Sequence, residues 1–331
     1  MSADKLVVTA SPHIRSVDSV PRIMWHVVAS LVPVVLCATW FFGVSALLQV
    51  GTAIAFALLT ERATGKGGAI ADGSATITGL LLGLSLPAGF PLWMTALGAA
   101  FAIVFGKQIW GGLGQNVFNP ALIGRAFLQA AFPVAITTWP LASGGFLMLR
   151  GDLFALPFTR PLPNAITSAT PLGLLKFEGK GTPLIDLVVG TTGGSVGETA
   201  ALVILAGGIY LAWRGYLNWR IPVSILVTVA AVSAIVHFAD ASKPAPLFML
   251  FSGGLMLGAV YMATDMVTSP GTNRGKWVFG AGIGLLVVVI RVWGGLPEGV
   301  MYAILFMNAL TPFINRATQP RVFGTRLGSV T

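Results

Sequence analysis

Apolar runs long enough to cross a lipid bilayer recur along almost the whole chain. Each run is about 17 to 25 residues long, the length that an α-helix needs to span the hydrocarbon core. Only 9% of the residues are charged, whereas roughly a quarter are charged in a soluble domain. The sequence therefore predicts an all-α polytopic membrane protein and excludes a soluble fold.

Clusters of Gly, Pro and charged residues divide the apolar runs into about ten predicted transmembrane helices. These spans lie near residues 24–42, 44–60, 74–90, 92–108, 117–135, 197–213, 221–238, 246–264, 277–293 and 297–312. Residues 1–331 then form a single membrane domain. Its parts are a first half (22–136), a long connection (137–196), a second half (197–315) and two tails (1–21 and 316–331).

The lysines and arginines predict the orientation, because cytoplasmic loops carry an excess of both. With a cytoplasmic N-terminus, thirteen of the twenty fall on the inner side and five on the outer side, while Arg125 and Arg291 lie within spans. We therefore expect both termini in the cytoplasm and the connection 137–196 on the outer, periplasmic face. Although the net charge is +9, these cations are scattered between apolar runs, which argues against nucleic acid as a partner.

One proline and Trp-Gly-Gly pattern occurs in both halves of the chain. Pro87 precedes Trp110-Gly111-Gly112 by 23 residues, and Pro270 precedes Trp293-Gly294-Gly295 by 23 residues. On the expected topology the first Trp-Gly-Gly is cytoplasmic and the second faces outward. The halves are therefore predicted to be two inverted five-helix repeats with interrupted helices and a ligand near their interface. Coincidence is the alternative, because Gly and Pro are common in membrane helices.

The long connection contains a hydroxyl-rich segment that is unsuited to a helix interior. It includes Thr167, Ser168, Ala169 and Thr170. A threonine in an exposed loop can accept a phosphoryl or nucleotidyl group that another enzyme transfers. The alternative is a structural one, in which a hydroxyl caps the N-terminus of a short helix.

A second polar segment, residues 191–199, precedes the sixth predicted span. Ser195, Glu198 and Thr199 lie here among glycines at an expected helix start, where free N–H groups suit a phosphate or a polar ring edge. The alternative is a flexible loop in which Glu198 is a first-turn acid that matches the helix dipole.

Two irregular segments on the predicted inner side are candidates for lining a ligand site. They are residues 111–120, which include Asn119, and residues 262–276, which include Asp265. Irregular backbone at membrane depth persists only where protein or a cavity shelters it. For Asp265 the alternative is a cap or an ion pair with Arg274 or Lys276. The isolated Arg125, Arg291, His26 and His237 are interpreted as helix-packing or interfacial groups.

Taken together, these motifs resemble the family formed by the RnfD (RsxD) component of the Rnf complexes and the NqrB component of the sodium-pumping NADH:quinone reductases. The resemblance runs nearly end to end, and the length of 331 residues favours the Rnf branch. The matching motifs are Ser11-Pro12-His13, Asp72 to Ala75 with Thr78 to Leu82, Gly111 to Pro120, Ser168-Ala169-Thr170, Gly194 to Thr199, Ala263 to Lys276, and Pro297-Glu298-Gly299 with Asn308-Ala309.

The resemblance implies that Thr170 carries FMN through a phosphoester, attached on the outer face by a flavin transferase that acts on residues 167–170. Asn164 and Ser168 stand where this family commonly has Asp and Gly, but the acceptor threonine is intact. The resemblance also implies a second, non-covalent flavin such as riboflavin, for which we expect linings around Asn119 and Asp265.

The family further implies a membrane electron carrier within a complex in a bacterial inner membrane that links ferredoxin and NAD to sodium or proton movement. Its partners would be the other Rnf subunits (A, B, C, E and G), together with membrane lipid. Since an inverted five-plus-five arrangement is also typical of secondary transporters and channels, a transporter without flavin is the competing interpretation. A purely structural anchor for redox partners is a third.

Overall fold

The computed structural model describes residues 18–65, 69–140, 146–147, 149–157, 167–198 and 201–320. Within these ranges the chain is predominantly helical. The motif Ser11-Pro12-His13, residues Asn164 and Thr199, and most of both tails lie outside the described residues.

Six α-helices make up the described part of the first half. They are α1 (Val20–Phe42), α2 (Val44–Thr64), α3 (Ser74–Ser85), α4 (Leu92–Ile103), α5 (Pro120–Ala131) and α6 (Pro133–Ile136). A short 3-10 helix, η1 (Ala69–Asp72), precedes α3, and a π-helical turn, η2 (Val104–Gln108), continues α4.

The connection and the second half contain the remaining elements. The connection has strands β1 (Trp139–Pro140) and β2 (Thr167–Ser168), helices α7 (Pro171–Gly173) and α8 (Leu184–Val189), and the π-turn η3 (Leu174–Glu178). The second half has α9 (Ala201–Trp213), α10 (Arg220–Ala239), α11 (Pro246–Phe251), α12 (Leu255–Leu257), the π-turn η5 (Gly258–Met262), α13 (Asn273–Trp293) and α14 (Val300–Thr318).

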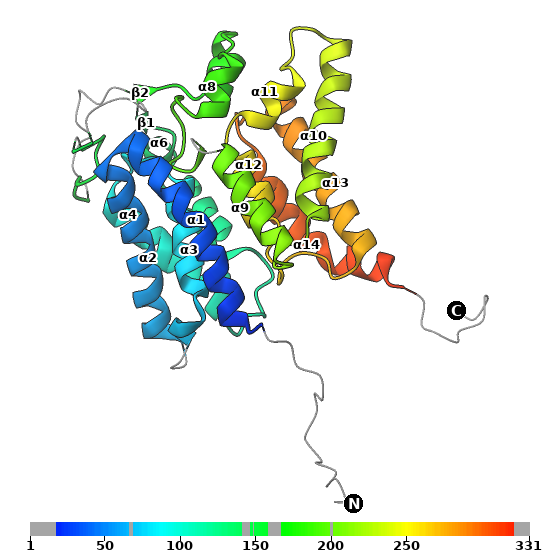
Figure 1. The fold of residues 1–331 in the computed structure, drawn as a ribbon. Helices are drawn as coiled ribbons and strands as arrows, with labels where there is room; N and C mark the ends of the chain where they lie inside the picture. The colour runs from blue at the N-terminus through cyan, green and yellow to red at the C-terminus, as the bar shows by residue number, and fades with distance from the viewer. Residues whose placement is uncertain are drawn as a thin grey trace, which may run out of the picture.

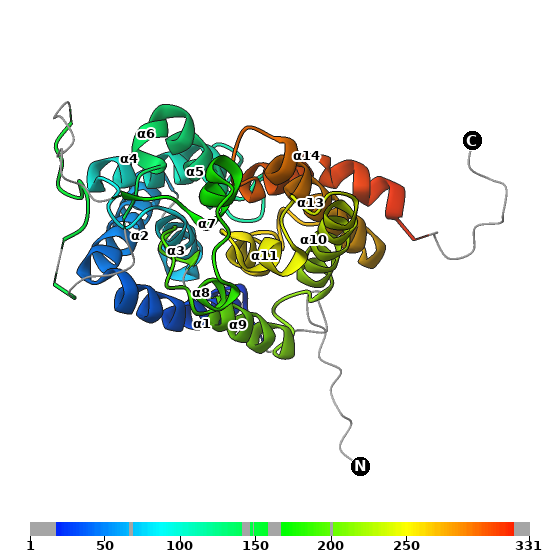
Figure 2. The same ribbon diagram turned by 90° about the horizontal axis from the view of Figure 1, so that it is seen from above.

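The helices form a bundle with two distinct ends (Figure 1). We call the end where α1 begins and α14 stops the tail face. The opposite end, where β1, β2 and α8 lie, is called the loop face. Seen from above, α1 to α6 form one group and α10 to α14 a second group beside it, and α9 packs against α1 (Figure 2).

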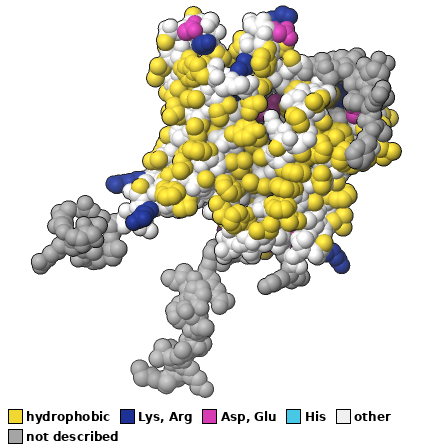
Figure 3. All heavy atoms as spheres, turned by 180° about the vertical axis from the view of Figure 1, so that it is seen from behind, with side chains coloured by type: hydrophobic (Ala, Val, Ile, Leu, Met, Phe, Trp, Pro, Cys, Tyr) yellow, Lys and Arg dark blue, Asp and Glu magenta, His cyan; other side chains and the backbone are white. Residues whose placement is uncertain are grey.

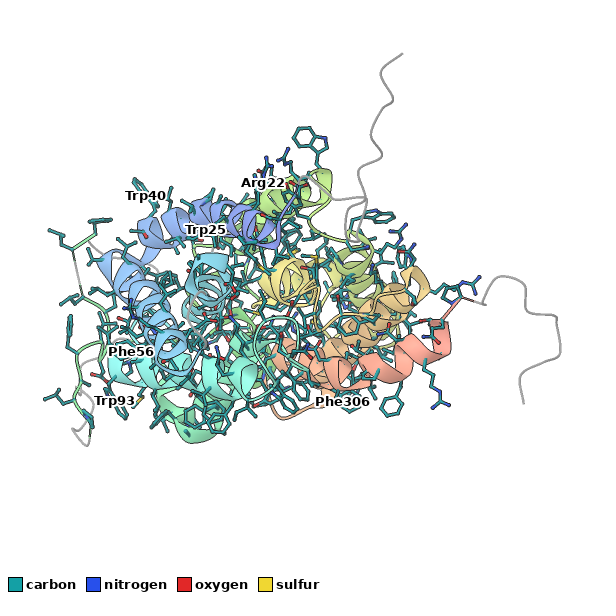
Figure 4. All side chains as sticks on the ribbon, turned by 90° about the horizontal axis from the view of Figure 1, so that it is seen from below. Arg22, Trp25, Trp40, Phe56, Trp93 and Phe306 are labelled. Carbon is teal, nitrogen blue, oxygen red and sulfur yellow. The ribbon has the colours of Figure 1, made fainter. Side chains whose placement is uncertain are left out.

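The surface and the helix lengths are those of a multi-pass membrane protein. Four helices, α1, α2, α10 and α13, are long and apolar enough to cross a bilayer, and three shorter apolar helices accompany them. Figure 3 shows apolar side chains over the middle of one face, with most charged side chains toward its two ends. Aromatic side chains such as Trp40, which is 83% exposed, and Phe306 point outward (Figure 4). The outer surface is therefore suited to lipid rather than to water.

Two predicted spans are broken in the structure. The prediction of one helix over 117–135 is wrong, because Pro133 cannot donate an amide hydrogen bond and separates α5 from α6. The prediction of one helix over 246–264 is also wrong in detail, since Gly253 has a φ of +66° and divides α11 from α12. A side chain at this φ would be strained.

The C-terminal end of α3 is completed by a segment from the distant connection. Helix α3 stops at Ser85, and Pro87 follows it. The carbonyl of Leu86 accepts a hydrogen bond from the N–H of Val196, and the carbonyl of Leu84 accepts one from Gly197. Carbonyls at a helix end need such partners where water is excluded. The interruption expected at Pro87 is therefore stabilised by residues more than a hundred positions later in the sequence.

Helices α2 and α3 pack closely because Gly79 has no side chain. A Cβ atom placed on Gly79 would lie 2.6 Å from the Cα of Ile54, whereas one on Gly51 of α2 would meet nothing within 4 Å. We expect Gly79→Ala to destabilise the fold by about 1–3 kcal/mol through overpacking. Gly51→Ala, the matched control, should be neutral or stabilising by up to about 1 kcal/mol through helix propensity.

The measurement is the thermal unfolding midpoint of the detergent-purified variants. Equal midpoints for Gly79→Ala and Gly51→Ala would show that the α2 and α3 backbones are not in close contact.

Candidate functional site

Two cavities lie at opposite ends of the bundle. The loop-face cavity has a volume of about 530 Å³ and the tail-face cavity about 100 Å³. Ligand sites in proteins are typically clefts of about 300–1,000 Å³ with mostly apolar walls and a few convergent polar groups. The loop-face cavity is therefore as large as a typical ligand site, whereas the tail-face cavity is smaller.

The loop-face cavity combines an apolar wall with a charged floor. Its apolar and aromatic lining residues are Ile136, Trp139, Leu172, Phe177, Leu296, Pro297 and Met301. Its charged lining residues are Arg125, Glu178, Glu198 and Glu298. Ala169 and Thr170 also line it, so the predicted acceptor threonine lies on a ligand-sized cavity.

Thr170 caps the short helix formed by α7 and η3. Its Oγ1 accepts a hydrogen bond of 3.1 Å from the N–H of Gly173, and its carbonyl accepts one of 2.8 Å from Leu174. The structural alternative from the sequence, an N-cap, is therefore confirmed. The two roles are compatible, because a phosphate esterified to an N-cap hydroxyl would lie near the positive end of the helix.

The segment before Thr170 is held by a small β-ladder. Ser168 pairs with Trp139 and Thr167 pairs with Pro140 in the antiparallel pair β1 and β2. Trp139 also lines the loop-face cavity. Residues 167–168 of the predicted transferase motif are thus fixed beside the cavity by backbone pairing.

Lys176 anchors the helix that Thr170 caps. Its ammonium donates hydrogen bonds to the carbonyls of Arg291 at 3.0 Å, Gly294 at 2.5 Å and Leu296 at 2.9 Å. These carbonyls belong to the C-terminal end of α13 and the residues after it, where a cation is favoured by the helix dipole. Desolvation lowers the pKa of Lys176. From the sequence, this lysine was predicted only to mark the outer side of the membrane.

An ion pair between the two halves forms the floor of the loop-face cavity. Nη2 of Arg125 lies 3.0 Å from Oε2 of Glu298. The other carboxylate oxygen of Glu298 accepts a hydrogen bond of 2.6 Å from the N–H of Gly254. Within the described residues, the buried Nε of Arg125 has no partner. This pair was not predicted from the sequence, because 173 positions separate its members and only folding brings them together.

Glu198 is the part of the predicted polar segment 191–199 that reaches the cavity. It accepts a hydrogen bond of 2.8 Å from the Ser195 hydroxyl, and it lines the cavity, whereas Ser195 is completely buried. The N–H groups of Val196 and Gly197 are engaged by α3 carbonyls. The carboxylate of Glu198 is thus the group that this segment presents to a ligand.

The tail-face cavity brings together the two irregular segments that the sequence singled out. Asn116, Asn119 and Asp265 all line it. Asn119 caps α5 through the N–H of Ala121 and donates a hydrogen bond of 3.1 Å to the carbonyl of Met262. The amide of Asn119 therefore joins the start of α5 in the first half to η5 in the second.

Asp265 caps its own turn. Its carboxylate accepts hydrogen bonds from the N–H of Val267 at 3.1 Å and from the Thr268 hydroxyl at 3.3 Å. This confirms the cap that the sequence offered as one alternative. Among the described ion pairs, none joins Asp265 to Arg274 or Lys276.

Lys107 adds a buried cation to the tail-face cavity. It forms an ion pair with Glu61 and donates to the hydroxyl of Ser74, and both Lys107 and Ser74 line the cavity. The second carboxylate oxygen of Glu61 is buried without a partner in the described part of the chain. The sequence did not predict this cluster, because Glu61 and Lys107 lie in different helices.

The π-helical turns lie at the cavities. Lys107 of η2 and Tyr261 of η5 line the tail-face cavity, and Phe177 and Glu178 of η3 line the loop-face cavity. Such turns are rare and often occur at functional sites. The π-helical turns therefore mark both cavities as candidate ligand sites.

The sequence matches the family described as NQR2, RnfD, RnfE over residues 7–324. It is 42% identical to the D subunit of the proton-translocating ferredoxin:NAD(+) oxidoreductase complex of Clostridium ljungdahlii, with 96% of each chain covered. It is 39% identical to the D subunit of the Na(+)-translocating complex of Acetobacterium woodii, with 98% of this chain and 97% of that chain covered. It is 40% identical to the D subunit of the ion-translocating oxidoreductase complex of Yersinia enterocolitica, with 97% and 99% covered.

The anchoring role of Lys176 can be tested with Lys180 as a control. Lys180 lies four residues away and, within the described part of the chain, forms an exposed ion pair with Glu178. Because hydrogen bonds to a charged group contribute about 1.5–3 kcal/mol, Lys176→Met should speed amide hydrogen exchange over residues 171–178 by about tenfold or more. Lys180→Met should leave these rates unchanged, and equal rates in both variants would contradict the anchoring role.

Proposed function

Because the chain belongs to the NQR2, RnfD, RnfE family, we propose that it is the membrane electron carrier RnfD of an Rnf-type complex. Such a complex transfers electrons between ferredoxin and NAD and moves sodium or protons, as the names of its relatives describe. The chain is then one part of an oxidoreductase and has no complete activity alone.

We further propose that Thr170 carries FMN through a phosphoester. The observation that carries this proposal is the position of Thr170 on a cavity of about 530 Å³ that is also lined by aromatic and charged side chains. In the attachment step, a flavin transferase brings an activated flavin phosphate to Thr170. The Oγ1 atom bonds to phosphorus, the donor's leaving group departs and the hydroxyl proton is released to the transferase.

The residues around Thr170 suit a tethered flavin. The N–H of Gly173, which donates to Oγ1 of Thr170, would lie near a phosphate esterified there, and Trp139 and Phe177 supply aromatic surface to the cavity. Lys176 fixes the helix that carries the tether to the end of α13. A bound flavin would supply one- and two-electron redox chemistry. The covalent bond to Thr170 would keep it at a fixed distance from its electron-transfer partners without depending on binding affinity.

The tail-face cavity is proposed to hold the second, non-covalent flavin. Asn116, Asn119 and Asp265 converge there with Lys107, and Met24, Val27 and Leu81 contribute apolar walls. Amide, carboxylate and ammonium groups can together satisfy the donors and acceptors of a flavin ring edge. The two irregular segments predicted from the sequence, residues 111–120 and 262–276, both contribute to the lining of this cavity, which supports the assignment.

Matching features in the two halves support the proposed ten spans and inverted repeats. A left-handed glycine precedes α3 in the first half and α12 in the second, with φ values of +78° at Gly73 and +66° at Gly253. In each half, a buried cation near the Trp-Gly-Gly pattern donates a hydrogen bond to a residue next to the left-handed glycine. Lys107 donates to the hydroxyl of Ser74, and Arg291 donates to the carbonyl of Ser252.

Helices α4 and α13, which each lead into a Trp-Gly-Gly pattern, run in opposite directions, as inverted repeats require. Helix α4 starts at the loop face, where the N–H of Leu92 bonds the carbonyl of Leu153, whereas α13 ends there against Lys176. On this basis the two cavities occupy equivalent places in the two repeats, one on each side of the membrane.

The proposed orientation places the tail face in the cytoplasm of a bacterial cell and the loop face in the periplasm. The positive-inside distribution of Lys and Arg supports it. The other Rnf subunits (A, B, C, E and G) are the proposed partners in the inner membrane, since electrons need a donor and an acceptor outside this chain. A transporter with the same inverted architecture remains the competing function, and it would require no flavin.

Tests at Thr170 can separate flavin attachment from helix capping. We expect Thr170→Asn, which keeps an N-cap but has no hydroxyl, to abolish flavin fluorescence on a denaturing gel of chain co-produced with a flavin transferase. Thr138→Ala removes another threonine of the same cavity and should leave the fluorescent band unchanged. A dark wild-type band would favour the transporter, and a fluorescent Thr170→Asn band would place the flavin elsewhere.

The second flavin can be measured separately, as the flavin released when the purified protein is precipitated with acid. We expect Asp265→Asn to lower this released flavin about tenfold, the effect of losing one charged hydrogen bond of about 1.5–3 kcal/mol. The control Asp240→Asn changes an exposed aspartate at the end of α10. An unchanged yield with Asp265→Asn would show that this carboxylate does not bind the ligand.

A further inference from the structure

We infer that Arg125, Glu298 and Glu198 recognise the hydrogen-bonding edge of the flavin ring in the loop-face cavity, and that the charges of Arg125 and Glu298 set its reduction potential. This inference rests on the proposed flavin at Thr170. It concerns the opposite side of that site, where the ring rather than the phosphate would be bound.

The three side chains form a fixed polar floor. Glu298 is held by two donors, Nη2 of Arg125 at 3.0 Å and the N–H of Gly254 at 2.6 Å. Glu198 lies beside the same residue, because a Cβ atom placed on Gly254 would be 2.7 Å from Oε1 of Glu298 and 3.7 Å from Oε1 of Glu198. Both carboxylates therefore converge on one backbone position beneath the cavity.

Arg125 has hydrogen-bonding capacity to spare. Its side chain is only 10% exposed, and its Nε is buried without a partner in the described part of the chain. Because Nε is buried, a ligand in the cavity would contact the terminal Nη atoms of the guanidinium, one of which also donates to Glu298. Arg125 is also the one cation among the described residues that line this cavity.

The floor complements the pyrimidine edge of an isoalloxazine ring. This edge presents a carbonyl, an N–H and a second carbonyl in a row. A guanidinium donates to the carbonyl oxygens, and an adjacent carboxylate accepts from the N–H. The walls match as well, because apolar and aromatic side chains in the lining can contact the faces of a ring.

The charges act on the flavin in opposite directions. Reduction adds electron density at the pyrimidine side of the ring, and a neighbouring charge tunes the electronics of such a cofactor. In a site partly shielded from water these interactions are stronger than in solution. Arg125 therefore favours the reduced ring, and the Glu298 carboxylate disfavours it.

A purely structural role for the same pair makes a different prediction. If Arg125 and Glu298 only tie α5 to the residues before α14, replacing either one weakens the fold and leaves the potential of the flavin unchanged. Opposite shifts of the potential after the two replacements cannot arise from loss of one structural contact.

The experiment is a spectroelectrochemical titration of the covalent flavin in the full chain, co-produced with a flavin transferase. The variants are Arg125→Gln and Glu298→Gln, with Arg125→Lys as the conservative replacement. Arg150→Gln is the matched control, because Arg150 is a buried arginine near the loop face that contacts Phe41 and Phe42 and does not line the cavity. Gel fluorescence reports attachment independently of the potential.

With attachment retained, we expect the ratio of reduced to oxidised flavin at a fixed potential to fall about tenfold in Arg125→Gln and to rise in Glu298→Gln. A tenfold change corresponds to about 30 mV for a two-electron couple. Arg125→Lys, which keeps the positive charge, should give a ratio close to that of the wild type, and Arg150→Gln should not change the ratio. If Arg125→Gln does not fold, the test is the ratio in Glu298→Gln: a rise supports the inference, and an unchanged or lower ratio contradicts it.

Fluorescent bands with unchanged ratios in Arg125→Gln and Glu298→Gln would overturn this inference and leave the flavin at Thr170 in place. Shifts of the same sign in both variants would also overturn it. A dark wild-type band would overturn the proposed function together with this inference.

Discussion

Two backbone hydrogen bonds at the end of α3 hold the two halves of this membrane protein in register. The carbonyls of Leu84 and Leu86 accept from Gly197 and Val196, so an interrupted helix is completed by a segment from the far side of the long connection. A bilayer offers no water to satisfy such carbonyls. The same contact brings Glu198 to the floor of the loop-face cavity, so the geometry of the site follows from a backbone constraint.

The remaining polar contacts extend this principle to side chains. Lys176 satisfies the last carbonyls of α13, Arg125 pairs with Glu298, and Lys107 pairs with Glu61. Each joins elements that are distant in sequence, and each lies at or beside a cavity. Buried charges are retained where they are paired, although their net contribution to stability is small. Arg125, Glu298 and Lys107 thus place charged groups on the walls of the two cavities.

The sequence was informative wherever a property is local. Run length and low charge predicted a helical membrane protein, and the four long apolar helices agree. The capping pattern around Thr170 was also readable, because an N-cap depends on residues three or four positions apart. The run over 246–264 was misread as continuous, since hydropathy does not register the left-handed conformation of Gly253 that divides α11 from α12.

By itself, the sequence determined the membrane class, the family and the candidate residues Thr170, Asn119 and Asp265. Tertiary structure alone decided that Asn119 and Asp265 share one cavity, and that Thr170 faces a second cavity with Arg125 and Glu298 on its floor. The physical reason is that ion pairs and cavity walls join residues more than a hundred positions apart. Periodicity and capping signals extend over only a few turns of helix, so they cannot encode such pairings.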